Sequence, residues 1–164
     1  SNSLLEALVF STQTLKKSVE DGLHQETPPE QHPTWKMPQN KVHLEAVRLV
    51  NCQDALRRLM WDYIGIVRND NRIQMGLKRF NVLREEIDHY FNQGHLNSRL
   101  LELRNLAHVA ELIIHCAMHR KESRGLHYNT DHPHTSQLPE NTHIWKTESG
   151  EIKITSKPIP NQPT

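Results

Sequence analysis

The stretch "LLELRNLAHVAELIIHCAMHRKESRG" (residues 100–125) determines the fold class, because its apolar side chains recur at helical spacing. The recurring positions are Leu103, Leu106, Ala110, Ile113 and Ala117. Steps of three and four residues place them on one face of an amphipathic helix. Asn97 and Ser98 are typical of a helix N-cap, so residues 98–123 are predicted to form one helix.

The end of this helix is predicted from its charges. Arg120, Lys121 and Arg124 would lie in the last turn, where cations complement the negative end of the helix dipole. Gly125 suits the position just after a helix, where a left-handed backbone is common.

Two earlier segments, residues 41–67 and 71–92, follow the same pattern. Their apolar stripes are Leu49, Cys52, Leu56, Leu59, Met60 and Tyr63, then Ile73, Leu77, Phe80, Leu83, Ile87, Tyr90 and Phe91. Asn69–Asp70 is typical of an N-cap and Gly94 of a helix stop. Short connections make neighbouring helices antiparallel, so an all-α, three-helix up-down-up bundle is predicted over residues 41–125.

A separate amphipathic helix is predicted at residues 3–25. Ser3 and Glu6 form an S-x-x-E capping box, and Gly22 is typical of a helix stop. Residues 26–40, "ETPPEQHPTWKMPQN", hold four of the nine prolines and are predicted to be a linker. The first helix is therefore not expected to belong to the three-helix core.

Beyond Gly125 the helical pattern ends. Residues 126–141 are polar and are predicted to form a loop, while residues 142–155 alternate around a Ser149–Gly150 turn. That alternation favours a small β-hairpin, which needs something to pack on. The segment 126–164 is thus expected to be a docking loop followed by an extended tail.

The composition limits the class of partner. The 164 residues include 20 basic and 19 acidic side chains, and the formal net charge is +1. No charge excess favours a nucleic-acid or membrane-surface partner, and no apolar run reaches the roughly 20 residues that cross a bilayer. Because no signal peptide and no initiator Met are present, a cytoplasmic location and a fragment of a longer protein are predicted.

Neither cysteine is expected to be reactive. Cys52 and Cys116 lie in apolar helical patterns and are interpreted as buried reduced thiols, with a disulfide as the less favoured alternative. Apolar neighbours do not activate a thiol, and no Gly-rich phosphate cradle or isolated carboxylate pair occurs. No catalytic residue is therefore assigned within this chain.

The 12 histidines raise the question of a metal site. His115 and His119 are four residues apart, a spacing that can chelate a metal ion. No carboxylate or cysteine completes a ligand set, however, and the adjacent Arg120 and Lys121 disfavour a dication. The favoured interpretation is solvated or interface histidines, with a metal-ligand role as the alternative and no metal assigned.

Three segments together resemble the carboxyl-terminal part of the L-aspartate oxidase family, flavoproteins of the succinate dehydrogenase and fumarate reductase superfamily. They are "SNSLLEALVF" (1–10), "LMWDYIGIVRND" (59–70) and "LLELRNLAHVAELIIHCAMHRKESRGLHYNTDHP" (100–133). The resemblance covers residues 1–20 and 41–133.

Within that superfamily, a few positions favour the oxidase family. They are Leu126, Asn129 and Trp61–Asp62–Tyr63, where succinate dehydrogenase-like chains usually differ. The same region of a fumarate reductase or succinate dehydrogenase flavoprotein is the runner-up. A stand-alone helical interaction module is the third hypothesis.

The resemblance implies a specific chemistry for the full-length enzyme. Non-covalent FAD would take hydride from L-aspartate to give iminoaspartate, and oxygen or fumarate would reoxidise the flavin, in the first step of quinolinate and NAD synthesis. It also implies that residues 1–25 belong to the flavin-binding domain and that Ser3 and Leu4 touch FAD. The isolated chain is expected to be inactive and to bind no FAD.

The resemblance further implies that "SRGLHYNTDHP" (123–133) docks against the FAD-binding and capping domains of the parent enzyme. The residues assigned to this contact are Ser123, Arg124, His127, Tyr128 and Asp131. Separately, Arg104 lies near the edge of an apolar stripe, and it is predicted to pair with an acid from a neighbouring helix: Glu85, Glu86 or Asp62.

Overall fold

The chain is mainly helical, as predicted. The computed structural model describes residues 3–22, 45–93 and 97–159. Two compact units, residues 1–37 and 38–164, each have their own internal contacts. The predicted linker at residues 26–40 lies outside the described residues.

The first unit contains helix α1 (Ser3–Glu20), which is shorter than the predicted helix over residues 3–25. Gly22 follows with φ at 77°, and its N–H donates to the carbonyl of Val19, so the predicted stop at Gly22 is confirmed. The Ser3 side chain of the predicted capping box lies outside the described part. The apolar side chains of α1 are exposed: Leu4, Leu5, Leu8, Val9, Phe10, Leu15 and Val19.

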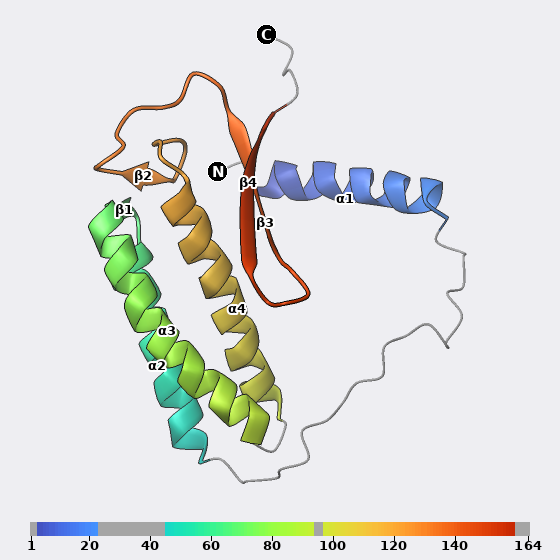
Figure 1. Cartoon of the computed structure of the whole chain (residues 1–164). Helices are drawn as coiled ribbons and strands as arrows, with labels where there is room; N and C mark the ends of the chain where they lie inside the picture. The colour runs from blue at the N-terminus through green and yellow to red at the C-terminus, as the bar shows by residue number, and fades with distance from the viewer. Residues whose placement is uncertain (1–2, 23–44, 94–96, 160–164) are drawn as a thin grey trace. The chain divides into compact units, whose positions relative to one another are not determined.

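The second unit is built on three helices that pack pairwise against one another (Figure 1). These are α2 (Ala46–Ile64), α3 (Asp70–Gln93) and α4 (Ser98–His119). The buried core consists of Leu49, Cys52, Leu56, Leu59, Ile64, Ile73, Phe80, Ile87, Leu100, Leu103, Ala107, Ala110, Ile114 and Ala117. Most of the predicted stripe residues are therefore buried.

The prediction is wrong for one residue of the apolar stripe on α4, because that residue does not face the core. Ile113 is 43% exposed, whereas its neighbour Ile114 is fully buried. Leu103, Ala110 and Ala117 are buried as predicted, and the fully buried positions between them are Ala107 and Ile114 rather than Leu106 and Ile113.

The helix starts agree with the predicted caps. The side chain of Asn69 accepts a hydrogen bond from the Arg72 N–H at 2.7 Å, and that of Asn97 accepts one from the Leu100 N–H at 2.9 Å. Each satisfies one of the free N–H groups of a first helical turn. The predicted stop at Gly94 lies outside the described residues.

Helix α2 ends at Ile64, three residues before the predicted end. A Cβ at Gly65 would come within 2.4 Å of the Trp61 carbonyl oxygen, so the chain leaves the helix where only glycine fits. Arg68 then folds back, and its Nε donates to the carbonyls of Ile64 and Gly65, both at 2.9 Å. The arginine thus satisfies two carbonyls that the helix end leaves free.

Helix α4 ends at His119, so the prediction that it continues to residue 123 is wrong. Arg120 has an extended backbone, with φ at −77° and ψ at 108°. The chain turns away because Glu122 and Ser123 are buried, and the Ser123 N–H donates to the His134 carbonyl at 3.1 Å. A local charge pattern cannot reveal this long-range contact.

The cations after α4 are consequently not in a last helical turn, and the interpretation of Arg124 as a helix-end cation is wrong. Gly125 does have a positive φ of 58°, but it does not follow the helix directly. It lies in a tight turn in which Arg124 and His127 exchange two backbone hydrogen bonds of 2.9 and 3.1 Å.

Four short strands complete the described part of the second unit. β1 (Val67–Arg68) and β2 (Tyr128–Asn129) form a parallel pair that was not predicted. The predicted hairpin is confirmed as β3 (Glu140–Lys146) and β4 (Ile152–Pro158), which extend beyond residues 142–155 at both ends. The hairpin packs on α4 (Figure 1). Lys146 Nζ of β3 lies 2.7 Å from Glu111 Oε2 of α4.

The predicted ion pair of Arg104 is wrong. Its guanidinium carbon lies 4.2 Å from the centroid of the Phe91 ring, a cation–π contact between α4 and α3. Within the described residues, no ion pair connects Arg104 to Glu85, Glu86 or Asp62. An aromatic face at this helix edge takes the place of the expected carboxylate.

Candidate functional site

The predicted docking residues lie in the segment that follows α4, which we call the exit loop (residues 120–136). The loop returns to the end of α2 through the β1–β2 pair, in which Val67 lies opposite Tyr128 and Arg68 opposite Asn129. The Thr130 N–H extends this ladder by donating to the Arg68 carbonyl at 2.8 Å. Residues some 60 positions apart in sequence therefore share one end of the helical unit.

Asp70, at the start of α3, binds the exit loop through its carboxylate. It accepts hydrogen bonds from Lys121 Nζ at 2.7 Å, from Asn129 Nδ2 at 2.9 Å and from His132 Nε2 at 2.9 Å. The hydrogen bond from Lys121, assisted by His132 and Asn129, holds the pKa of Asp70 far below its usual range. A charged carboxylate is thus the natural state of this junction.

The backbone around Asp70 is fixed as well. The Asp70 N–H donates to Asp131 Oδ2 at 2.8 Å, so Asp131 satisfies a free N–H in the first turn of α3. A carboxylate is favourable at this positive end of a helix. Asp131, one of the predicted docking residues, is therefore engaged within the chain.

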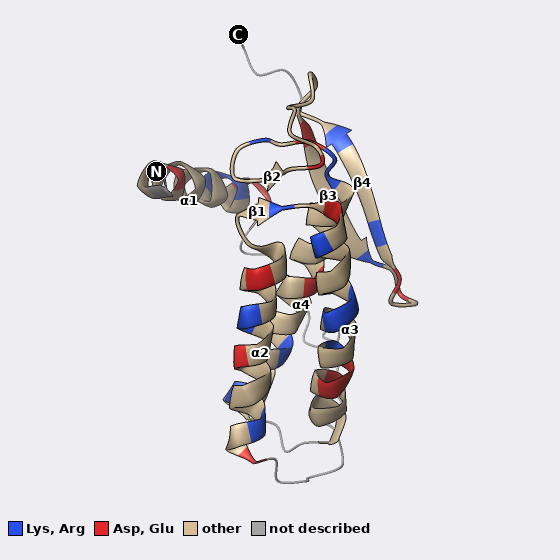
Figure 2. Cartoon of the chain, turned by 90° about the vertical axis from the view of Figure 1, so that its left-hand side faces the viewer, with Lys and Arg blue, Asp and Glu red and all other residues tan. Residues whose placement is uncertain are grey.

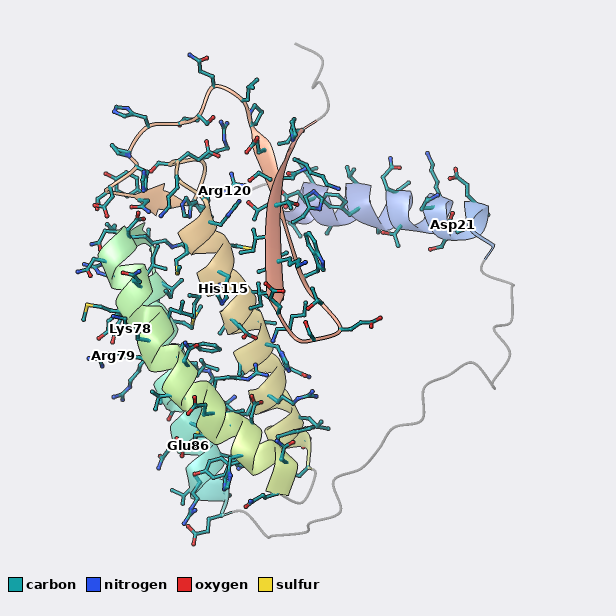
Figure 3. All side chains as sticks on the ribbon, in the orientation of Figure 1. Asp21, Lys78, Arg79, Glu86, His115 and Arg120 are labelled. Atoms are coloured by element: carbon teal, nitrogen blue, oxygen red, sulfur yellow. The ribbon has the colours of Figure 1, made fainter. Side chains whose placement is uncertain are left out.

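Glu122 forms a second, more deeply buried junction. Its carboxylate lies 2.7 Å from Arg120 Nη1 and 3.1 Å from Arg124 Nε, and it accepts the Ser136 N–H at 2.9 Å. Burial alone would raise the pKa of this carboxyl, but the Ser136 N–H and the two guanidinium groups outweigh it, so the pKa is lowered. Arg120 also donates to the Glu140 carbonyl, connecting α4 to the hairpin where Figure 3 labels it.

Ser123 and Asn129 form the buried centre of the exit loop. Ser123 Oγ donates to the His132 carbonyl at 2.8 Å and accepts the Asn129 N–H at 3.0 Å. Asn129 is completely buried, and its Oδ1 accepts the Asp131 N–H at 3.0 Å. A buried amide and hydroxyl with their partners satisfied give the loop one defined conformation.

His127 bridges the ends of two helices. Its Nδ1 lies 2.8 Å from Arg68 Nη1, and its Nε2 lies 3.2 Å from the carbonyl of Arg120. Burial, followed by the charge of Arg68, lowers the pKa of this imidazole.

Of the predicted docking residues, Ser123, Arg124, His127 and Asp131 all direct polar atoms toward partners within the chain, either in the exit loop or at helix ends. Tyr128 differs, since it is 45% exposed, and the adjacent turn presents Leu126 at 93% exposure. The docking role of these residues stays a prediction. In the structure, the four residues with bonded polar atoms shape the loop, whereas Leu126 and Tyr128 form its exposed apolar surface.

Asp70, Glu122 and Arg68 belong to this site but are not predicted as members of it from the sequence. The sequence predicts Asp70 only as part of a helix cap, although its carboxylate accepts three hydrogen bonds from the exit loop and its N–H donates a fourth, to Asp131. The segment "RND" (68–70) lies within the stretch 59–70 that supports the family resemblance. That position is the sequence feature that could have indicated a role for Arg68 and Asp70 in the site. Nothing in local spacing connects it to residues 121–132.

The predicted flavin contacts are Ser3 and Leu4, and their role stays a prediction. Leu4 lies in the first turn of α1 and is 87% exposed, and the Ser3 side chain lies outside the described part.

Within residues 3–22, 45–93 and 97–159, the other thiols and histidines form no metal-binding cluster. Cys52 and Cys116 are free thiols, and burial, with a contribution from Glu86, raises the pKa of Cys52 to about 11. Among the described His, Cys, Asp and Glu residues, no group of three could hold a metal ion. His115, labelled on α4 in Figure 3, has a pKa lowered chiefly by burial.

Charges of both signs are interspersed along the helices of the second unit (Figure 2). No helix in the described part of the chain is long and apolar enough to span a bilayer.

Comparison with known proteins places this arrangement in a family. The family model described as "Fumarate reductase flavoprotein C-term" matches residues 53–164. The chain therefore belongs to the fumarate reductase flavoprotein carboxyl-terminal family.

Individual relatives are more specific. The chain is 42% identical to L-aspartate oxidase of Yersinia pestis over 87% of its own length, and 44% identical to that of Pseudomonas aeruginosa over 85%. It is 31% identical to the chloroplastic L-aspartate oxidase of Oryza sativa over 99% of its length. In these relatives the match spans only 26%, 26% and 27% of the longer protein, about a quarter of each.

Solved structures show the same fold at lower identity. The FrdA chain of E. coli quinol fumarate reductase aligns with a TM-score of 0.61 and 17% identity, over 99% of this chain and 26% of FrdA. The apo Sdh1 complex of Mycobacterium smegmatis aligns with a TM-score of 0.51 and 20% identity, over 90% of this chain and 25% of the matched chain.

Proposed function

We propose that this chain is the carboxyl-terminal region of an FAD-dependent L-aspartate oxidase. The parent enzyme would transfer hydride from L-aspartate to FAD, release iminoaspartate, and pass the electrons to oxygen or fumarate. The supporting observation is 40–44% identity to four bacterial L-aspartate oxidases over 81–87% of the chain. The aligned FrdA and Sdh1 chains share only 17–20% identity.

In that enzyme the three packed helices would act as an up-down-up docking bundle rather than as a catalytic domain. The exit loop would face the FAD-binding and capping domains, with Leu126 and Tyr128 as its apolar contact. Large apolar side chains with 93% and 45% exposure favour such a contact. Ser123, Arg124, His127 and Asp131 would hold this surface in shape, since their polar atoms bind the loop and the starts or ends of helices.

FAD would be held mainly by parts of the parent enzyme outside this chain. The 164 residues contain no G-x-G-x-x-G segment for the dinucleotide phosphates. The residues present fit only a peripheral contact at the first turn of α1, which begins at Ser3 and exposes Leu4. Free N–H groups and positive potential at a helix start suit the flavin edge, which gains negative charge on reduction.

The test is performed on the full-length parent protein. Its gene should restore growth of an NAD-auxotrophic strain that lacks L-aspartate oxidase, and L-aspartate should bleach the flavin absorbance of the purified enzyme under anaerobic conditions. Restored succinate respiration without aspartate-dependent bleaching would instead favour the fumarate reductase or succinate dehydrogenase alternative. A gene that encodes no upstream dinucleotide-binding segment would favour a stand-alone helical module.

A further inference from the structure

The hydrogen bonds of His127 specify its protonation state. Arg68 Nη1 can only donate, so the imidazole Nδ1 at 2.8 Å must accept and carry no proton. The Arg120 carbonyl can only accept, so Nε2 at 3.2 Å must donate to it. Both contacts together require the neutral Nε2–H tautomer.

Arg68 cannot easily turn away from this ring. Its Nε is held by the carbonyls of Ile64 and Gly65, and its backbone pairs with Asn129 in the β1–β2 ladder. A proton on Nδ1 would therefore place two cations and two donors face to face at the same position. The contact would be lost rather than rearranged.

The other charges around His127 do not compensate for a second proton. Arg120 at the end of α4 adds positive charge, and the one facing carboxylate, Glu122, is already bound by Arg120 and Arg124. His127 is half-buried beside an open pocket that Arg68 and Cys116 also line, so solvent protons can reach it.

We propose that His127 is a proton-sensitive acceptor that keeps the exit loop ordered, and that its protonation releases the loop from the end of α2. The β1–β2 pair and the turn carrying Leu126 and Tyr128 would open together, because Arg68 joins all of them. Loop release is argued from the contacts alone. Its consequence, weaker docking in acid, rests on the proposed function.

The pH window follows from the direction of the shift. A histidine whose folded-state pKa lies below its unfolded value of about 6.5 binds fewer protons when folded. The stabilisation is complete above that pH and is lost as the pH falls through the folded-state pKa. The pKa values of Asp70 and Glu122 are lowered, so these carboxylates remain charged at the start of the window.

The experiment measures amide hydrogen exchange of the full 164-residue chain between pH 7 and pH 5, corrected for intrinsic rates. The reporter is the Thr130 N–H, which donates to the Arg68 carbonyl. In the wild type, its opening constant should rise by up to about tenfold per pH unit in the window. His127→Asn keeps an acceptor near Arg68 but does not titrate, so its exchange should be flat with pH.

The control is His132→Asn, which removes the other histidine of the loop with a hydrogen-bonded ring. His132 contacts the Asp70 carboxylate rather than Arg68, so its ring lies outside the proposed switch. This variant should retain the wild-type pH dependence. The same slope in wild type and His127→Asn, or no slope in either, would overturn the proposal.

Two further measurements separate the possible failures. Imidazole ¹⁵N shifts of wild-type chain at pH 7 should show the Nε2–H tautomer of His127 even if His127→Asn misfolds; an Nδ1–H or doubly protonated ring would contradict the proposal. In the full-length enzyme, acid-dependent FAD loss should be weaker in His127→Asn. Loop release without any change in FAD retention would reject the docking role but leave the histidine switch intact.

Discussion

At the scale of single residues, Arg124 is the side chain whose geometry matters most for the docking hypothesis. Its Nε contacts both oxygens of the buried Glu122 carboxylate at 3.1 and 3.3 Å, and its Nη2 donates to the Ser136 carbonyl at 2.6 Å. The planar guanidinium makes these contacts at once, which a lysine ammonium cannot do.

Arg124→Lys should therefore loosen the exit loop, cost about 1 kcal/mol of unfolding free energy, and reduce FAD occupancy in the full-length enzyme. Flavin absorbance per protein, together with thermal melting of the chain, measures both effects. Arg57→Lys, at an exposed arginine paired at 3.9 Å with Asp54, is the matched control and should leave both unchanged. Equal FAD occupancy in wild type and Arg124→Lys would reject the docking role of this residue.

Asp70 makes a different prediction, because its contribution depends on pH. Asp70→Asn keeps the size of the side chain but removes the charge that Lys121 and His132 bind. The carboxylate is over a third exposed, so the expected loss at neutral pH is only about 1 kcal/mol of unfolding free energy.

The lowered pKa of Asp70 predicts how the loss of stability in Asp70→Asn changes with pH. A carboxyl whose folded-state pKa is depressed stabilises the fold above its ordinary value of about 4, and that contribution is lost as the pH falls further. Wild type and Asp70→Asn should thus differ in urea unfolding at pH 7 and converge in strong acid. Asp54→Asn, at an exposed carboxylate, should match the wild type throughout; a constant difference at all pH values would contradict the assigned cause.

At the scale of elements, α2 and α3 approach each other closely at Gly76. An added Cβ would meet Tyr63 Cβ at 2.8 Å and Ile64 Cδ1 at 3.1 Å, so even a methyl group would push the helices apart. Overpacking costs about 1–3 kcal/mol, while alanine gains about 1 kcal/mol in helix propensity over glycine.

Gly76→Ala should accordingly destabilise the chain by about 1 kcal/mol in net terms, and the measurement is urea unfolding by circular dichroism. Gln74→Ala, at an exposed position two residues earlier on α3, is the control and should be neutral. A stabilised Gly76→Ala protein would show that the helices can separate without cost.

What the sequence could predict about these elements depends on the range of the interactions. Helices α2, α3 and α4 were predicted from periodic apolar positions, and the hairpin from alternation around Gly150, because both patterns are local. The predicted end of α4 was wrong because a distant contact, from Ser123 to His134, draws the chain away, whereas α2 ends three residues early at Gly65, where a side chain would clash with the Trp61 carbonyl. Arg68 pairs with Asn129 across 61 positions, and no local signal encodes that pairing.

The same limit applies to the candidate site. The family resemblance located the exit loop, but it did not show that Ser123, Arg124 and His127 bind within the chain. That arrangement depends on Asp70 and Glu122, which in sequence look like a helix cap and a solvent-exposed acid. Burial of Glu122 between two arginines appears only once α4 is seen to end at His119.

At the scale of the whole molecule, the chain should not bind FAD with sub-micromolar affinity when isolated. It offers two predicted flavin contacts, Ser3 and Leu4, and no dinucleotide phosphate site in its sequence. Titration of flavin fluorescence with the purified chain should show no saturation below about 1 μM, a level that corresponds to roughly 8 kcal/mol of binding free energy. Saturable sub-micromolar binding would mean that flavin recognition extends well beyond these contacts.

The division into two units leads to the last prediction. Unit 1 contains α1, whose apolar side chains are exposed, whereas every buried core residue that the structure describes lies in α2, α3 or α4 of unit 2. Limited proteolysis in the Pro-rich segment at residues 26–40 should therefore leave a stable product that begins near Lys41. Because the cut removes none of the core residues, this product should melt as cooperatively as the intact chain.

Mass spectrometry identifies the cleavage site, and calorimetry compares the product with the intact chain. The Gly76→Ala chain is cut in the same way as a control. The cut variant should be less stable than the cut wild type by the same amount as the uncut variant is less stable than the uncut wild type, because the helix contact at Gly76 remains in the product. If the cut abolishes the cooperative transition, α1 contributes to the stability of the helical core. The assignment of α1 to the flavin-binding part of the parent enzyme would then lose its physical basis, since one helix can hardly bury the same apolar stripe against two different domains.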